Sequence, residues 1–358
     1  MSLYSLPPML NALKPLPKAV LHDHLDGGLR IETILELAGA VGYAGLPEDD
    51  ADALRSWFVQ AESGSLERYL QAFDHTVAVM ANQDAIRRVA FETGVDLAAD
   101  GVVYAEVRFG PALHRPAGLT LEAVIEAALD GFAAASRDHG IVLFAIVTAL
   151  RQHNDSEDVA RAASQYVGRG VVAFDLAGPE AGFPADDHLP ACLIAREAGL
   201  GLTIHAGEGD GPDSIWRALA RCGAQRIGHG VRIIDDTQVS DGKIIKTGRL
   251  ATRVRDHRIP LEVSPTSNVH TGAFPDIERH AFGPLYRAGF NVTINTDNRL
   301  MSGITLSDEY AALATAFGLD MTDLGNITEN ALLAGFGDWP TRQRLIEEVV
   351  RPAYDVAI

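Results

Sequence analysis

The sequence predicts a (β/α)8 barrel, a fold in which eight parallel strands alternate with helices. Three observations support this prediction. Eight short apolar segments rich in β-branched residues recur along the 358 residues, and longer stretches with helical periodicity separate them. From the second segment on, neighbouring segments are roughly 30 residues apart, as a strand–helix–strand unit requires. Strands that are apolar throughout are typical of a parallel sheet covered on both faces.

Each expected strand is an apolar run with polar or turn-forming residues at both ends. The expected strands span residues 19–24, 102–109, 141–149, 170–176, 201–205, 226–229, 259–264 and 291–296. The expected helices between them include residues 121–139, 189–198, 214–222 and 277–288. An open doubly wound sheet is the alternative, but the GxGxxG fingerprint that would follow its first strand is missing.

Two stretches depart from simple alternation. About 75 residues separate the first strand from the second, far more than one crossover helix needs. Within them, residues 65–80 carry apolar side chains at helical spacing, so we expect extra helices inserted there. Residues 235–249 are polar and contain two glycines, which predicts an excursion after the sixth strand. Since no linker or repeat divides the chain, we expect residues 1–358 to form a single domain.

The composition restricts the class of partner. Lys and Arg number 30 and Asp and Glu 48, a net charge of −18 that repels phosphate backbones, so we expect no nucleic acid partner. Two cysteines cannot build a disulfide framework. No apolar run approaches the ~18 residues of a membrane span, and the first residues lack a signal-peptide core. We therefore expect a soluble, cytoplasmic protein that does not bind membranes.

Residues that commonly bind metals end four of the expected strands, in the segments LHDHLDGG, TIHAGEGDG, RIGHGV and TINTDNR. The carboxyl ends of barrel strands meet at one mouth. His22 and His24 are two residues apart, so their side chains point to the same face. Together with His205 and Asp297 they offer three imidazoles and a carboxylate, a set that suits zinc. A hydrogen-bonded pair of polar residues at a strand end is the alternative for His22 and His24.

Two further residues lie where they can act beside such a metal. Glu208 follows His205 in the loop that leaves the fifth strand, which suits a general acid or base; a solvated loop carboxylate is the alternative. His229 ends the sixth strand between two glycines, which let the backbone approach closely and the ring face the cavity. A hydrogen-bonded core histidine is the alternative for His229.

Seven segments together resemble a known family. In chain order, LHDHLDGG, YAEVRFGP, VVAFDLAG, TIHAGEG, IGHGV, SPTSNVHTGA and INTDN resemble segments of the adenosine deaminases of the amidohydrolase superfamily. The resemblance runs from about Lys18 to about Asn330, nearly the full chain. It implies a (β/α)8 barrel that holds one zinc ion and hydrolyses the 6-amino group of adenosine or 2′-deoxyadenosine, as in purine salvage.

The resemblance also implies roles for matching residues. The implied zinc ligands are His22, His24, His205 and Asp297. Glu208 is the implied proton donor to the purine nitrogen N1. His229 resembles the residue that orients the attacking water and helps to deprotonate it, and Asp297 is expected to accept a hydrogen bond from the same water.

Further matches concern the substrate, beside which His24 also lies. Asp26 resembles the carboxylate that holds a ribose hydroxyl, and Gly178 the glycine whose backbone N–H reaches N3. The apolar gate over the substrate is implied to contain Leu66, Tyr69 and Leu70.

One position departs from the family pattern, and it leaves the preferred purine open. Many members carry two aspartates where this chain has Asp297 and Asn298. An amide NH2 donates to the purine N7 without having to be protonated first.

An adenine or aminodeoxyfutalosine deaminase, a non-catalytic purine-binding protein, and an esterase or amidase on a similar barrel remain alternatives. The absence of a CxxC motif excludes the cytidine deaminase architecture, and FDLAGPE lacks the lysine expected to bridge two metals.

Overall fold

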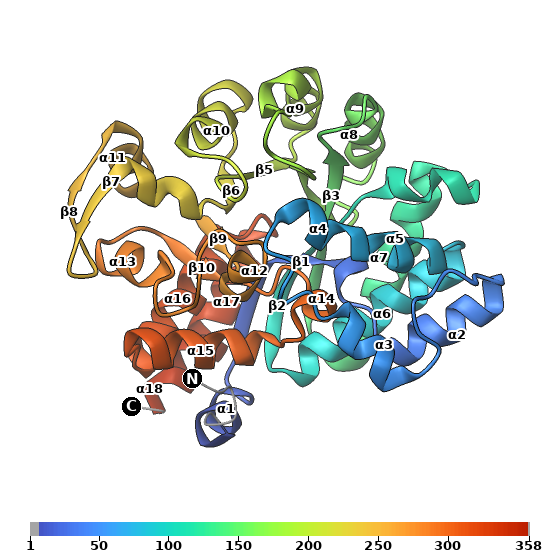
Figure 1. Ribbon diagram of the computed structural model, residues 1–358, viewed down its shortest axis with the longest axis horizontal. Coiled ribbons are helices and arrows are strands. Elements are labelled where there is room, and N and C mark those ends of the chain that lie inside the picture. The colour runs from blue at the N-terminus through green and yellow to red at the C-terminus, as the bar shows by residue number, and fades with distance from the viewer. Residues whose placement is uncertain (1–6, 357–358) are drawn as a thin grey trace.

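The computed structural model describes residues 7–356. Eight strands form one sheet in the order β1-β2-β3-β4-β5-β6-β9-β10, and the pairs of neighbouring strands are parallel (Figure 1). The strands are β1 (Lys18–His24), β2 (Val102–Phe109), β3 (Val142–Leu150), β4 (Val171–Ala177), β5 (Gly201–Ala206), β6 (Arg226–His229), β9 (Leu261–Val263) and β10 (Val292–Ile294). The predicted parallel barrel is therefore confirmed.

The barrel closes at a narrow seam between its first and last strands. Just beyond β10, Asp297 forms a parallel bridge with Asp23 of β1. The backbone N–H of His24 donates to the Asp297 carbonyl at 2.7 Å, and the N–H of Asp297 donates to the His22 carbonyl at 2.9 Å. The side chain of Asn295 accepts a further backbone N–H of β1 at 2.8 Å. The seam thus lies among the residues that the sequence predicts to bind metal.

Helices surround the sheet, and several follow a strand directly, as the fold requires (Figure 1). Outside the insertion after β1 they are α1 (Pro7–Leu13), α7 (Leu121–His139), α8 (Ser156–Ser164), α9 (Leu189–Glu197), α10 (Pro212–Arg217), α11 (Arg249–Asp256), α12 (Pro265–His270), α13 (Phe282–Arg287), α14 (Arg299–Ser302), α15 (Leu306–Phe317), α16 (Met321–Ala334), α17 (Trp339–Leu345) and α18 (Arg351–Val356). No helix within residues 7–356 combines the length and the apolar character needed to cross a membrane.

The long connection between β1 and β2 holds the extra helices that the sequence predicts. They are α2 (Ile31–Val41), α3 (Ala51–Phe58), α4 (Leu66–Tyr69) and α5 (Phe73–Val79), followed by α6 (Gln83–Ala99). A 3-10 turn over residues 70–72 joins α4 to α5. The Ser65 side chain caps α4 by accepting the backbone N–H of Arg68, and Asn82 caps α6 in the same way.

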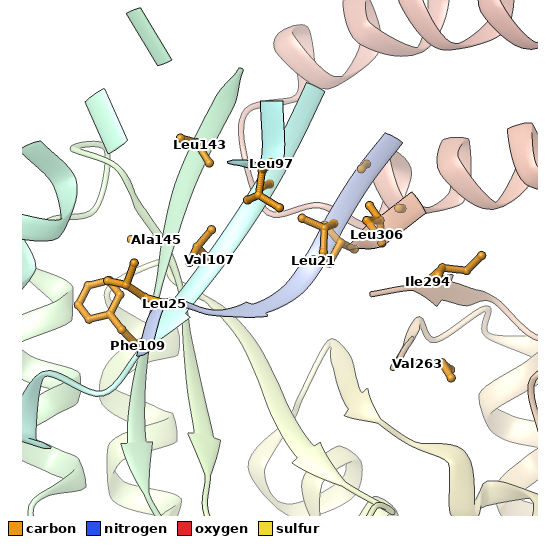
Figure 2. Packing of buried hydrophobic residues seen from close by; sticks show 14 of the residues in the cluster. Leu21, Leu25, Leu97, Val107, Phe109, Leu143, Ala145, Val263, Ile294 and Leu306 are labelled. Carbon is orange, nitrogen blue, oxygen red and sulfur yellow. The ribbon is translucent and has the colours of Figure 1, made fainter. Parts of the chain in front are cut away.

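Alternation divides each strand between two environments. On β2, Ala105 and Val107 are buried among apolar side chains of the core, whereas Glu106 and Arg108 form buried ion pairs with strands across the barrel. Figure 2 shows the apolar layer, in which Val107 lies near Leu97 of α6 and Leu143 of β3. The hydrophobic core thus lies largely between the sheet and its helices, and the barrel interior is left for polar groups.

The structure answers two further local predictions, one about the excursion after the sixth strand and one about the helix expected over 277–288. The predicted excursion after the sixth strand is an antiparallel hairpin of β7 (Thr237–Ser240) and β8 (Lys243–Thr247), at the edge of the molecule (Figure 1). The helix predicted over 277–288 is wrong at its start, because α13 begins only at Phe282. A turn precedes it, in which the N–H of His280 donates to the Ile277 carbonyl. The His280 ring then accepts the N–H of Phe282 at 3.0 Å, in place of a backbone carbonyl one turn earlier.

Candidate active site

Four side chains meet at the carboxyl ends of the strands, and they are the four that the sequence predicts as metal ligands. His22 and His24 come from β1, His205 from β5, and Asp297 from the segment after β10. The Nε2 atoms of His22 and His24 each lie 3.3 Å from Oδ1 of Asp297, and those of His24 and His205 lie 3.3 Å apart. One ligand atom from each of the four residues lies within 4.8 Å of the others.

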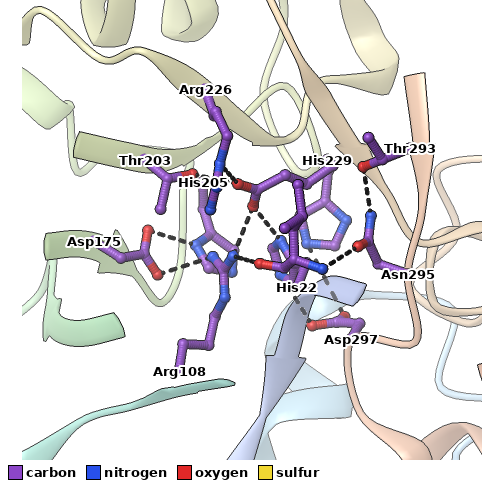
Figure 3. Close-up of polar contacts among 12 residues, drawn as sticks. His22, Arg108, Asp175, Thr203, His205, Arg226, His229, Thr293, Asn295 and Asp297 are labelled. Atoms are coloured by element: carbon purple, nitrogen blue, oxygen red, sulfur yellow. Dashed lines mark hydrogen bonds and ion pairs between the residues drawn. The ribbon is translucent and has the colours of Figure 1, made fainter. Parts of the chain in front are cut away.

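Carboxylates hold two of these rings from behind. Nδ1 of His22 lies 2.9 Å from Oε2 of Glu262 on β9. Nδ1 of His205 lies 3.1 Å from Oδ1 of Asp175 on β4 (Figure 3). A carboxylate on Nδ1 favours the tautomer with its proton on Nδ1 and leaves the Nε2 lone pair free for a metal. The two carboxylates therefore aim both Nε2 atoms into the mouth.

Glu262 is the centre of a buried charge network below the mouth. Besides the His22 ring, its carboxylate accepts hydrogen bonds from Arg108 at 2.6 Å, Arg226 at 2.6 Å and Thr203 at 2.9 Å. Burial opposes ionisation, but the two guanidinium groups and the His22 ring hold the pKa of Glu262 well below its usual value. A buried charge satisfied on this scale is rigid, so it fixes the ring that bonds to it.

The geometry of the four residues fits a metal ion. Nε2 of His22 is buried and has no hydrogen-bond partner among the described residues, although a buried polar atom is usually satisfied. Asp297 also has a backbone φ of 57°, which a non-glycine residue adopts at an energetic cost. Nε2 of His22 and the carboxylate of Asp297 lie at the same point of the mouth, as they would in a preformed ion site.

Glu208 lies above the four residues in a loop that another carboxylate anchors. The Glu180 side chain accepts the four successive backbone N–H groups of residues 207–210, at 2.6, 3.0, 2.8 and 3.1 Å. Burial, reinforced by the charges of Asp297 and Glu180, raises the pKa of Glu208 well above its usual value. The surroundings of Glu208 thus favour the neutral, protonated form of its carboxyl group.

His229 completes the mouth. Its Nε2 lies 3.5 Å from Oε2 of Glu208 and 4.0 Å from Oδ2 of Asp297. The same Oδ2 accepts a hydrogen bond from the Ser267 hydroxyl at 2.6 Å. The backbone of His229, at the end of β6, has a φ of 60°, so His229 is a second strained residue at this site.

A cavity opens from this cluster. On its apolar side the described lining residues are Leu66, Tyr69, Leu70, Phe73, Leu113 and Leu150; its polar lining includes His24, Asp26, Asp74, Gln152, His205, Glu208, His229, Asp297 and Asn298. The predicted gate residues of α4 and the turn after it therefore lie at the cavity. Tyr69 is held in place by a 2.9 Å hydrogen bond between its hydroxyl and that of Ser302.

The predicted substrate contacts also line this cavity. Oδ1 of Asp26 is buried without a hydrogen-bond partner in the described chain, and burial raises the pKa of Asp26 to about 7. Oδ1 of Asn298 is likewise buried without a partner in residues 7–356 and lies against Gly27, where a Cβ would overlap it. Gly178 has a φ of 95° at the end of β4, and a Cβ there would overlap Gln152. A backbone that must approach a ligand closely often carries glycine in this conformation.

Sequence reasoning missed the residues that hold the site from outside. These are Glu262, Asp175, Glu180, Ser267 and Asn268. A signal was present for two of them, because Asp175 and Glu262 are charged residues inside otherwise apolar strands. Burial of such a residue demands a partner, although the sequence does not say which one.

A buried glutamate under this region gives stability a pH dependence. Glu309 of α15 is fully buried and accepts the Thr266 N–H at the start of α12 at 2.9 Å. Burial raises the pKa of Glu309 from 4.5 to about 8, against the effect of that hydrogen bond. The folded state therefore holds a proton that the unfolded chain has released, and stability falls as pH rises between these two values, by at most ~5 kcal/mol.

Glu309→Gln removes this dependence, because an amide stays neutral. We expect the melting temperature of the variant to rise relative to that of the wild type as pH increases from 5 to 8.5, in thermal unfolding of samples with matched metal content. The exposed Glu348 supplies the control, since Glu348→Gln should show no such trend. Parallel curves for Glu309→Gln and the wild type would contradict the assignment.

Comparison with known proteins agrees with this geometry. A family model described as adenosine deaminase matches residues 17–352. Parallel eight-stranded barrels that gather histidines and an aspartate at the strand ends are typical of amidohydrolases, whose deaminases depend on a metal. The chain belongs to the adenosine deaminase family.

Relatives and solved structures support the assignment. An adenosine deaminase of Mycobacterium marinum is 50% identical over 357 residues, covering 98% of this chain and 99% of the relative. The adenosine deaminase of Mycobacterium tuberculosis is 50% identical over 353 residues, 97% of each. Among solved structures, the adenine deaminase of Arthrobacter aurescens superposes with a TM-score of 0.84 at 26% identity, over 94% of this chain and 98% of that one. An amidohydrolase of Burkholderia ambifaria with bound Zn gives 0.84 at 25% identity, over 97% and 93%. Arabidopsis ADAL in complex with IMP gives 0.82 at 26% identity, over 97% and 99%.

Proposed function

We propose that this protein hydrolyses the 6-amino group of adenosine and of 2′-deoxyadenosine, which yields the corresponding inosine and ammonia. The observation that carries the proposal is the position of Glu208. This buried carboxyl group, with its raised pKa, lies beside a group of residues that can hold a metal and lines a cavity with an apolar wall. The 50% identity to curated adenosine deaminases over nearly the whole chain supports the same reaction.

The metal in this proposal is one zinc ion per chain, held by His22, His24, His205 and Asp297. Imidazole and carboxylate ligands in this ratio suit zinc, and a structural neighbour was solved with bound Zn. A zinc ion in such a site supplies a Lewis acid that brings the pKa of water into the neutral range.

The other side chains around the mouth supply a proton and contact the water. Water adds its oxygen to C6, and Glu208 gives a proton to the purine N1. The C6–N6 bond then breaks and ammonia leaves, as one proton of the water passes to the departing amino group and the other returns to Glu208. Glu208 holds the proton that N1 takes up, and a positioned proton donor of this kind contributes ~10²–10⁴-fold. Asp297 and His229 lie where they can contact the attacking water, close to Glu208.

The unpaired groups of the cavity match the remaining edges of a purine nucleoside. Asp26 offers its unpartnered oxygen to a ribose hydroxyl, and the Gly178 backbone to N3. Because Oδ1 of Asn298 lies against Gly27, we assign the amide nitrogen of Asn298 to the acceptor N7. Leu66, Tyr69 and Leu70 would cover the face of the base.

The charges of the cavity favour a nucleoside over a nucleotide. Of the described residues that line it, none is a lysine or an arginine, and four are the carboxylates Asp26, Asp74, Glu208 and Asp297. A 5′-phosphate would find acidic side chains there and no lysine or arginine to bind it. The structural neighbours from Arabidopsis include an N6-methyl-AMP deaminase and a complex with IMP, so the difference between nucleoside and nucleotide is worth measuring.

The experiment that tests the proposal follows the ultraviolet change on deamination. Adenosine, 2′-deoxyadenosine, adenine, aminodeoxyfutalosine and AMP are incubated separately with the zinc-loaded protein. We expect the first two to give the highest kcat/KM. A higher kcat/KM for adenine, aminodeoxyfutalosine or AMP would overturn the assignment to a nucleoside, and no turnover of any of the five would overturn the reaction itself.

Asn298 offers a sharper test of how the base is held. In 7-deazaadenosine a C–H replaces N7, so the amide donor loses its acceptor, at a cost of ~1–3 kcal/mol or roughly 5- to 150-fold in kcat/KM. Asn298→Ala should lower kcat/KM for adenosine and shrink the preference for adenosine over 7-deazaadenosine. Since the ring change also alters reactivity at C6, the coupling between the two changes is the informative quantity. Coupling near zero would mean that Asn298 does not contact N7.

A further inference from the structure

A chain of three buried hydrogen bonds leads from the His229 ring to a backbone N–H outside the site. Nδ1 of His229 lies 3.0 Å from the side-chain nitrogen of Asn268 on α12. The side-chain oxygen of Asn268 lies 3.3 Å from Nε2 of His280, whose Nδ1 accepts the backbone N–H of Phe282 at 3.0 Å. His229, Asn268 and His280 are each at most 1% exposed, so water does not offer these groups another partner.

The far end of this chain determines where its protons are. A backbone N–H can only donate, so Nδ1 of His280 must be the acceptor, and the proton of the neutral His280 ring is on Nε2. Nε2 then donates to Asn268, which must present its oxygen there and its NH2 to His229. The flipped amide would place two donors face to face at His280. Burial lowers the pKa of His280 to about 3, consistent with a neutral ring.

The hydrogen bond from Asn268 also determines which nitrogen of His229 carries the proton. Because the Asn268 NH2 donates to Nδ1 of His229, this nitrogen carries no proton, and the proton of the neutral ring is on Nε2. Nε2 is the atom that points at Glu208 and Asp297, at 3.5 and 4.0 Å. In this arrangement the ring offers a donor, and no free lone pair, to whatever lies between these side chains.

We propose that Asn268 and His280 are positioning residues that lock His229 in the tautomer with its proton on Nε2. The proposal rests on the proposed function for the meaning of this tautomer. A neutral His229 in this form donates a hydrogen bond to the attacking oxygen and so orients the water. It cannot take a proton from that water, because its other nitrogen is occupied by the Asn268 amide. The family resemblance implies that His229 also helps to deprotonate the water. In this tautomer His229 cannot do so, and another group must accept that proton.

The direct test is the ¹⁵N NMR spectrum of the zinc-loaded protein labelled at histidine, with the His229 signals identified by their loss in His229→Asn. We expect Nε2 of His229 to show the shift of a protonated nitrogen and Nδ1 that of an unprotonated one. Asn268→Asp replaces the donor by a carboxylate, which requires a proton on Nδ1, so the ¹⁵N pattern should reverse or both nitrogens become protonated. A wild-type ring with its proton on Nδ1, or a pattern unchanged by Asn268→Asp, would overturn the proposal.

Kinetics separate positioning from packing. His280→Leu removes the donor to Asn268 and should lower kcat for adenosine ~10–100-fold with little change in KM, the usual cost of losing an outer hydrogen-bond partner. His280→Gln keeps an NH2 that can donate to the Asn268 oxygen and should recover much of this loss. Phe274→Leu is the packing control: the Phe274 ring lies 4.5 Å from that of His280, centroid to centroid, but takes no part in the hydrogen bonds. It should leave the ¹⁵N pattern unchanged.

These outcomes are distinguishable from failure of the proposed function. The ¹⁵N spectrum needs no substrate, so it reports on the tautomer even if adenosine is not turned over. Equal losses of kcat in His280→Leu, His280→Gln and Phe274→Leu, with one ¹⁵N pattern throughout, would assign His280 to packing alone and contradict the positioning role.

Discussion

Glu208→Gln is expected to lower kcat by ~10²–10⁴-fold while the protein keeps its metal. The amide retains the shape of the side chain but has no acidic proton for the purine N1. The four backbone N–H groups that anchor the loop bind Glu180, not Glu208, so the loop should keep its conformation. Steady-state kinetics with adenosine and elemental analysis of the same preparation measure the two effects together.

Glu67 is the matched control for charge. It is an exposed glutamate on α4, near enough for its charge to act on Glu208. Glu67→Gln removes a carboxylate near the same mouth without touching the proposed proton donor, so kcat should change little. If Glu208→Gln keeps near-normal kcat, or if both variants lose activity equally, Glu208 is not the proton donor.

Removing one proposed ligand should abolish both metal binding and activity. The purified protein is expected to contain about one zinc per chain, and His22→Ala and His24→Ala should each lose it, because a catalytic zinc site has few protein ligands to spare. Elemental analysis and the adenosine assay give the two readouts. Active protein without a transition metal, or with two ions per chain, would contradict the proposal.

The two variants differ in what else they disturb. His22→Ala deprives the buried Glu262 carboxylate of a hydrogen-bond partner, so it should also lower stability. Among the residues that the structure describes, no carboxylate lies within hydrogen-bond distance of Nδ1 of His24, since Asp26 is 4.0 Å away. His24→Ala therefore tests metal binding with less damage to the fold. His257→Ala is the control, because this histidine is exposed and belongs neither to the proposed metal ligands nor to the lining of the cavity.

Local patterns in the sequence predicted much of the fold and the residues at the mouth. The period of two along β1 directs His22 and His24 inward and Asp23 to the other side, where it pairs with Arg299. Strand ends with metal-binding residues predict a shared mouth, because a parallel barrel brings those ends together. Both inferences need only the chain near each residue and the general rule of the fold.

What the sequence could not predict depends on partners that are distant along the chain. Glu262 and His22 are 240 positions apart, and nothing near either residue identifies the other. The start of α13 was missed for a related reason, since the buried His280 side chain takes over the first hydrogen bond of the helix. The anchoring of residues 207–210 by Glu180 is also invisible until both loops are placed.

The position of the proposed metal at the seam has a mechanical consequence. The described residues join β1 to the end of β10 through one bridge and a few hydrogen bonds, and the proposed ligands lie on both sides: His22 and His24 on the first strand, Asp297 beyond the last. A bound ion would thus cross-link the first and last strands of the barrel. Without the ion, only the few hydrogen bonds of this seam connect the two strands. Chelation should therefore quicken amide exchange first along β1 and the segment around Asp297, and only later in β3 and β4 on the opposite wall.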